Sequence, residues 1–155
     1  MFLHGGWVRR RSLRLVPDRA AYRQPLLLLL VLLGGTTGTL GRWAAGLAVP
    51  HVDRVPLGTL AVNVVGAFVL GALLEHLAGR GSDEGRRRAL RLTLGTGFCG
   101  GFTTYSALTD DTDALLRQGL VGHALAYVGA TLVLGLVASA LGIAAARRRA
   151  RGGAA

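Results

Sequence analysis

The stretch GFCGGFTTYSAL, residues Gly97–Leu108, places helix-weakening residues inside a segment that otherwise has the composition of a membrane span. The adjacent Gly100 and Gly101 each weaken a helix by about 1 kcal/mol relative to alanine, and the threonines after them compete for backbone hydrogen bonds. Non-helical backbone at membrane depth survives only where it is buried in protein or lines a cavity. The stretch therefore predicts a broken helix, which is either an ion site built from freed backbone groups or a simple kink with a close-packing surface.

The rest of the chain has the composition of a membrane domain. Of its residues, 51% are hydrophobic and 17% are charged, whereas soluble domains carry about 25% charged residues. Charged side chains are absent from residues 24–41, 55–74, 92–109 and 118–146. Each of these stretches is close to or longer than the ~17–20 residues that a helix needs to cross a bilayer. We expect an all-α membrane protein with four transmembrane helices, the third broken near its middle, in one domain over residues 25–146.

The basic residues are all arginine, and they are unevenly distributed. Fifteen of the 18 lie before the first span, between the second and third spans, or after the fourth; Arg42, Arg54 and Arg117 lie on the other side. The positive-inside rule then places both termini in the cytoplasm. A net charge of +10 is also found in nucleic-acid-binding proteins. Here the arginines occupy connections rather than one face of a folded domain, so we expect a lipid bilayer and not nucleic acid as the partner.

The two ends of the chain are rich in arginine and lie outside the predicted spans. Residues 1–24 are expected to be disordered or to lie on the membrane surface, and residues 147–155 form a basic tail. Neither end carries a motif that predicts a function.

Small residues in the first span predict a close helix–helix contact. Gly34, Gly38 and Gly41 lie at spacings that allow another helix to approach closely. Arg42, which follows them, either anchors the helix end at the membrane interface or attracts anions to a vestibule.

Polar residues in the second and fourth spans must face protein or water. An amide in hydrocarbon is costly unless it is hydrogen-bonded, so Asn63 either joins two helices or lines a pore. Tyr127 and Thr131 are four residues apart and share one helix face with Ser139. This polar stripe indicates either bonding between helices or a wet path.

Three segments together resemble the CrcB/Fluc family of fluoride channels. They are GGTTGTLGR at 34–42, PLGTLAVNVVGAFVLG at 56–71 and GFCGGFTTYS at 97–106. The resemblance extends over roughly residues 25–146. It implies a channel in the cell membrane that lowers cytoplasmic fluoride by passive export. It also implies an antiparallel dimer of four-helix subunits with a structural sodium ion at its centre.

The resemblance also assigns roles to individual residues. The backbone carbonyls of Gly100 and Thr103 would hold the sodium ion, which agrees with the preference of hard cations for oxygen ligands. The Asn63 amide would donate to fluoride, and Arg42 and Asp111 occupy positions in or near a vestibule. The other residues expected along the fluoride pathway are polar or aromatic: Thr104, Tyr105, Ser106, Tyr127 and Thr131.

Two features depart from the family pattern. The family stretch TTFSTF reads TTYSAL here, so Tyr105 keeps an aromatic ring and Leu108 has none to offer an anion. The strong arginine bias predicts insertion in one orientation only. An antiparallel dimer would then need a non-identical homologous subunit of opposite bias.

Three functions remain open from the sequence, none of them enzymatic. The chain is a conducting fluoride-channel subunit, a non-conducting assembly subunit of a heterodimeric fluoride channel, or a small four-helix exporter of the multidrug type. The first span lacks the carboxylate on which that exporter class relies, and this counts against the third function.

Overall fold

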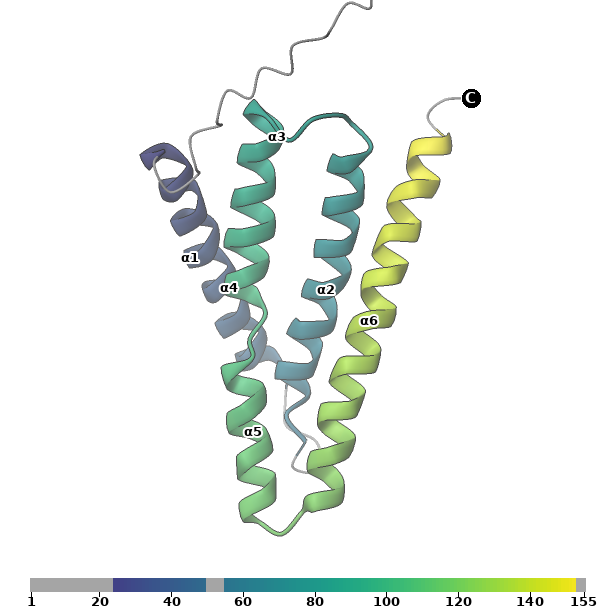
Figure 1. Ribbon diagram of the computed structural model, residues 1–155. Helices are drawn as coiled ribbons and strands as arrows, with labels where there is room; N and C mark the ends of the chain where they lie inside the picture. Colours follow the sequence, from purple (N-terminus) through teal and green to yellow (C-terminus); the bar gives the residue numbers. More distant parts are fainter. Residues whose placement is uncertain (1–23, 50–54, 153–155) are drawn as a thin grey trace, which may run out of the picture.

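The computed structural model describes residues 24–49 and 55–152, which form a bundle of helices running alternately up and down (Figure 1). Three helices are long and apolar enough to cross a membrane: α1 (Pro25–Ala48), α2 (Leu57–Ala78) and α6 (Val121–Gly152). The described start of α1 and the end of α6 lie at the same end of the bundle (Figure 1). The arrangement matches an even number of membrane crossings.

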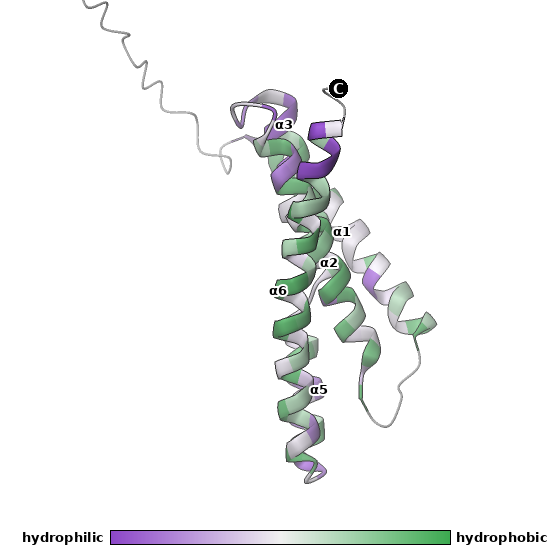
Figure 2. Cartoon of the chain, turned by 90° about the vertical axis from the view of Figure 1, so that its right-hand side faces the viewer, coloured by the Kyte–Doolittle hydropathy of each residue, from purple (hydrophilic) through white to green (hydrophobic). Residues whose placement is uncertain are grey.

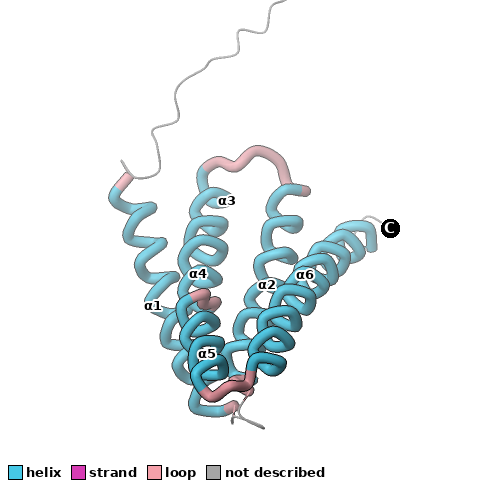
Figure 3. The backbone as a smooth tube through the Cα atoms, turned by 60° about the horizontal axis from the view of Figure 1, so that its bottom comes forward, coloured by secondary structure: helices cyan, strands magenta, loops and turns pink. Residues whose placement is uncertain are grey.

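The third crossing is made of four consecutive helical pieces. These are α3 (Gly85–Leu90), the π-helical segment η2 (Arg91–Cys99), α4 (Gly100–Phe102) and, after a break, α5 (Ser106–Arg117). The break is visible as a loop between α4 and α5 in the middle of the bundle (Figure 3). The predicted all-α fold with a broken third helix is confirmed.

The ends of the chain fall partly outside the described residues. The predicted N-terminal extension lies outside them except for Gln24, as do residues 153–155 of the basic tail. The rest of that tail is helical, because α6 continues without interruption through Gly152. The polar end of α6 therefore projects as a helix beyond the apolar part of the bundle (Figure 2).

Facing glycines bring α1 against the third crossing. A methyl group added to Gly34 would overlap the carbonyl of Thr93, and one added to Gly101 would overlap the carbonyl of Gly35. The predicted close-approach surface of α1 is thus confirmed at Gly34, which is buried. A methyl group added to Gly38 would likewise overlap the carbonyl of Phe98. Such contacts stabilise membrane bundles because lipid gives helices no hydrophobic reason to associate.

Close contacts at glycines also bring α2 against α6. A methyl group on Gly142 would overlap the Phe68 carbonyl, and one on Gly71 would lie 2.5 Å from the carbonyl oxygen of Ser139. Large apolar side chains instead point away from the bundle, as at Leu136, which is 74% exposed. The outward apolar surface is what a lipid environment requires.

Candidate ion site at the helix break

The break in the third crossing lies at Thr103–Tyr105, within the Gly97–Leu108 stretch in which the sequence predicted it. Thr103 is the first extended residue, with φ −78° and ψ 160°, whereas Gly100 and Gly101 are helical residues of α4. Gly101 packs closely against α1, and this packing outweighs the weak helix propensity of glycine.

Asn63 of α2 forms two hydrogen bonds with Thr104, the residue after the extended Thr103, and this pair of bonds is called the clasp below. Its amide nitrogen donates to the carbonyl of Thr104 at 3.0 Å, and its amide oxygen accepts the Thr104 N–H at 2.8 Å. One side chain thus satisfies both backbone groups of a buried residue. The amide nitrogen carries a second N–H bond, and no acceptor for it is found among the described residues.

Arg42 of α1 reaches the same break from the other side. Its Nη1 donates to the Thr103 carbonyl at 3.2 Å. Arg42 is half-buried, so this contact ties the end of α1 to the break. The two broken-helix residues Thr103 and Thr104 are therefore each held by a side chain from a different helix.

The diversion of one backbone bond releases the carbonyl of Gly100. In a continuous α-helix this carbonyl would accept the N–H of Thr104, but that N–H donates to Asn63. Gly100 is exposed, and the space beside its Cα is open within the protomer. The released carbonyl of this exposed residue is an oxygen ligand of the kind that a hard cation such as sodium prefers.

The Thr103 carbonyl fits such a cation less simply. It already accepts a hydrogen bond from Arg42, and a carbonyl oxygen has two lone pairs. One lone pair remains for an ion, beside a guanidinium of the same charge. In the described part of the chain, no cluster of three His, Cys, Asp or Glu residues offers an alternative metal site.

The far side of the break presents hydrogen-bond donors. The Thr104 hydroxyl accepts the Ala107 N–H at 3.1 Å and shares a hydrogen bond of 3.2 Å with the Ser106 hydroxyl. This caps the start of α5, whose N-terminal end carries a partial positive charge. Tyr105 is 77% exposed beside it. The break therefore joins the released Gly100 carbonyl on one side to the hydroxyls of Thr104 and Ser106 on the other.

Tyr127 and Thr131 belong to a separate cluster between α5 and α6. The Tyr127 hydroxyl donates to the Asp111 carboxylate at 3.0 Å, and the Thr131 hydroxyl donates to the Tyr127 carbonyl at 2.8 Å. Both side chains are buried, and Leu108 packs against Tyr127 in the same cluster. Their polar atoms are thus committed to contacts inside the protomer.

Sequence reasoning brought together Asn63, Arg42 and the threonines but missed how they meet. The sequence did not predict the two hydrogen bonds between Asn63 and Thr104. An amide side chain can nevertheless donate to a backbone carbonyl and accept from a backbone N–H at the same time. The sequence offered two signals for this contact: the amide of Asn63 in the second span and the predicted break in the third.

The family relationship follows from comparison with known proteins. A family model described as CrcB-like protein, Camphor Resistance (CrcB), matches residues 29–143. The chain belongs to the CrcB family. The matched part of this CrcB chain includes all the site residues described above and ends before the arginines of α6.

Curated relatives of the CrcB chain are named as fluoride-specific ion channels. It is 51% identical over 117 residues to fluoride-specific ion channel FluC 2 of Leifsonia xyli subsp. xyli, an alignment that covers 76% of this chain and 81% of that protein. It is 48% identical over 126 residues to FluC 1 of Cutibacterium acnes, covering 81% and 88%. FluC of Sorangium cellulosum is 44% identical over 120 residues, covering 75% and 91%. The resemblance drawn from the sequence motifs is confirmed.

Proposed function

We propose that this CrcB chain is a subunit of a fluoride-specific ion channel that exports fluoride passively across the cell membrane. The observation that carries the proposal is the helix break held by Asn63, in a chain whose relatives are named fluoride-specific ion channels. Such a break supplies fixed polar groups at membrane depth without exposing them to lipid.

The groups at the break have the chemistry that fluoride needs. Fluoride is small, strongly hydrated and a strong hydrogen-bond acceptor, so a pathway must replace its water with donors. The second N–H of Asn63 and the hydroxyls of Thr104 and Ser106 are such donors, and the ring edge of Tyr105 is electropositive. We assign Tyr127 to the wall of the pathway, since its hydroxyl is bonded to Asp111. Thr131 supports the same wall from one turn away.

Fluoride-electrode efflux from liposomes tests this function. Vesicles containing the assembled channel should release fluoride and retain chloride. Asn63→Asp should slow the release, because a carboxylate replaces a donor with negative charge. The matched control Gln118→Glu makes the same change from amide to carboxylate at an exposed position, and it should leave efflux unchanged. Equal efflux from wild type and Asn63→Asp would exclude Asn63 from the pathway.

We also propose that the exposed face of Gly100 is the centre of an antiparallel dimer. Sodium would bind there to the carbonyls of Gly100 and Thr103, as a structural ion. The released carbonyl and the open space beside Gly100 support this assignment.

Gly100→Ala tests the dimer, because the open space accepts a methyl group in the protomer but not against a closely packed partner. The variant should keep its helical content and lose dimerisation, measured by cross-linking in liposomes. Gly129→Ala, at another exposed and open glycine, should dimerise normally. A Gly100→Ala protein that still dimerises would contradict this placement.

The partner subunit is proposed to be a non-identical homologue, with both termini of this chain in the cytoplasm. Fifteen of 18 arginines on one side favour a single orientation, and the numbered names of two relatives, FluC 2 and FluC 1, are consistent with paired subunits. The only cysteine, Cys99, is buried. Single cysteines at Gln118 and Gly152 can therefore be labelled with an impermeant maleimide with little background.

In intact cells, label should reach Gln118→Cys and not Gly152→Cys, and the order should reverse in inverted vesicles. Labelling of both sites from both sides would show dual insertion and remove the need for a second kind of subunit.

A non-conducting assembly role is the second candidate, and the observation favouring it is Leu108, a buried aliphatic residue in place of the family aromatic. The two roles separate when the chain is assembled with a partner chain. Asn63→Asp in this chain slows efflux if the chain lines a pore, and leaves efflux unchanged if the chain only assembles the partner.

A further inference from the structure

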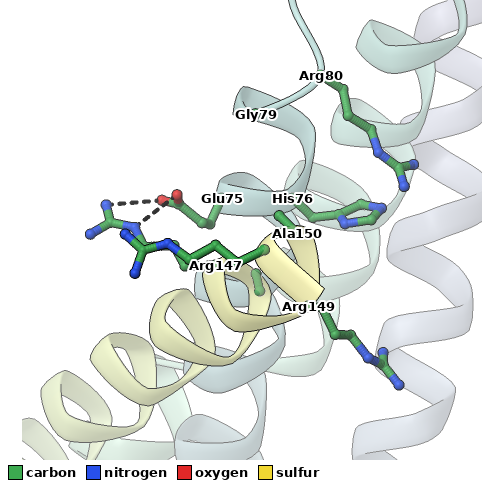
Figure 4. Close-up of a pocket in the computed structure, with 9 residues that line it drawn as sticks. Glu75, His76, Gly79, Arg80, Arg147, Arg149 and Ala150 are labelled. Atoms are coloured by element: carbon green, nitrogen blue, oxygen red, sulfur yellow. Dashed lines mark hydrogen bonds and ion pairs between the residues drawn. The ribbon is translucent and has the colours of Figure 1, made fainter. Parts of the chain in front are cut away.

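The polar end of the bundle contains a cavity between the ends of α2 and α6. It has a volume of about 800 Å³ and is shown in Figure 4. Its lining is dominated by basic side chains from both helices: His76, Arg80, Arg147, Arg149 and Arg151. Glu75 is the one acidic residue in the lining.

The acidic residue is already neutralised. Glu75 accepts two hydrogen bonds from Arg147, at 2.9 and 3.3 Å. Arg80, Arg149 and Arg151 have no ion-pair partner within the part of the chain that the structure describes. The C-terminal ends of α2 and α6 each contribute a partial negative charge of about half a unit. Three unpaired arginines exceed this sum, so the cavity attracts anions.

The side chains divide into two groups around the cavity. In Figure 4, Glu75 and Arg147 pair on one side of α2, whereas His76 and Arg80 extend to the other side. Arg149 extends from α6 away from the Glu75–Arg147 pair (Figure 4). The unpaired Arg80 and Arg149 therefore lie on the side away from the ion pair.

An apolar groove continues from the basic cavity along the same two helices. His76, Ala146 and Arg149 line both spaces, and the groove adds Phe68, Ala72, Leu73 and Ala145 in a volume of about 490 Å³. A free phosphate would use only the basic part. A phospholipid would use both, with its phosphate near the arginines and an acyl chain along the groove.

We propose that this cavity and groove bind an anionic phospholipid. The occupant follows from charge complementarity at the head and apolar surface at the tail, in a chain that spans a membrane. The arginines of α6 lie beyond the residues that define the family, so the site is an addition to the channel fold. It does not depend on which ion the channel conducts.

Native mass spectrometry of the full chain in detergent provides the test. The probes are dioleoyl phosphatidylglycerol, dioleoyl phosphatidylcholine and glycerol 1-phosphate, which has a phosphate and no acyl chains. Phosphatidylglycerol should bind more tightly than phosphatidylcholine, and glycerol 1-phosphate should not displace it. Displacement by glycerol 1-phosphate at a similar concentration would show a free-phosphate site and overturn the proposal.

Charge variants locate the site. The double variant Arg80→Gln, Arg149→Gln should weaken phosphatidylglycerol binding by about tenfold or more, since each arginine near a lipid surface contributes about fivefold. The control Arg86→Gln, Arg117→Gln removes the same charge from exposed positions elsewhere and should change binding less than about twofold. Equal losses in both would show nonspecific attraction and overturn the proposal.

Filling the groove separates a lipid from a second protein copy. Ala145 is exposed and lines the groove, so Ala145→Phe should weaken phosphatidylglycerol binding without changing the far-ultraviolet circular dichroism spectrum. If the variant instead abolishes dimerisation and leaves lipid binding unchanged, the groove is a protein contact and the proposal is wrong.

Discussion

Replacing Asn63 should destabilise the folded chain more than any other single amide in its described part. Asn63→Leu keeps a side chain of similar size and removes both hydrogen bonds to Thr104, of 3.0 and 2.8 Å. Thr104 is only 9% exposed, so water does not readily replace the lost partner. The variant therefore leaves one backbone donor and one backbone acceptor unsatisfied.

The magnitude follows from these two groups. A buried polar group left without a partner costs about 1–3 kcal/mol, but side-chain hydrogen bonds between membrane helices average about 0.6 kcal/mol and reach about 1.7. The membrane values are the better guide, because the unfolded chain also finds partners there. Two bonds at the upper part of that range give a loss of about 2–3 kcal/mol.

The assay is equilibrium unfolding in mixed dodecyl maltoside and dodecyl sulfate micelles, followed by circular dichroism. The control is Gln118→Ala, which removes an amide that donates to the Ala114 carbonyl at 3.0 Å on an exposed helix end. The control should lose less than about 0.5 kcal/mol, as exposed substitutions usually do. If Asn63→Leu unfolds with the same free energy as the control, the clasp does not hold the break, and the amide acts only on the ion.

Three further outcomes are expected in the same unfolding assay. Gly142→Ala should lower the free energy of unfolding by about 1–3 kcal/mol, because the added methyl group overlaps α2. Gly135→Ala, where the space is open, should raise it by up to about 1 kcal/mol. Equal effects of the two substitutions would contradict the packing argument. Tyr127→Phe should lower the free energy of unfolding by about 1–2 kcal/mol, because the Asp111 carboxylate of α5 loses the hydrogen bond from the Tyr127 hydroxyl. An unchanged free energy would refute that role. Arg91 donates to Asp83 and holds the pKa of that carboxyl below its usual range. A lowered pKa stabilises the fold at neutral pH, so this contribution should disappear below about pH 4 in wild type and be absent at every pH in Asp83→Asn.

The features that the sequence predicted correctly depend on residues close together in the chain. The length of each charge-free stretch predicts a span, and the four-residue spacing of Gly34 and Gly38 predicts a face for close packing. The break itself was also predictable, because glycines and threonines weaken a helix wherever it lies. None of these inferences needs knowledge of which helices are neighbours.

The features that were missed depend on register between helices. Within the predicted stretch, the first extended residue is Thr103, and the glycines before it stay helical because Gly101 packs closely against α1. The clasp needs Asn63 and Thr104 at the same depth in two different crossings, and nothing local in either segment specifies that depth. The helical overhang of α6 was missed for another reason, because a run of arginines was interpreted as a tail.

The contacts that hold the break also bear on the proposed sodium site. Arg42 occupies the Thr103 carbonyl, and Asn63 occupies both backbone groups of Thr104. These contacts come from within the protomer, so the break is preorganised before any partner binds. The same contacts release the carbonyl of Gly100, which is an exposed residue. In the proposed sodium site, the Gly100 carbonyl and the remaining lone pair of the Thr103 carbonyl are too few ligands for a hard cation. We therefore expect a partner surface to supply the others, so that the contacts that stabilise the break also leave the proposed site dependent on a partner.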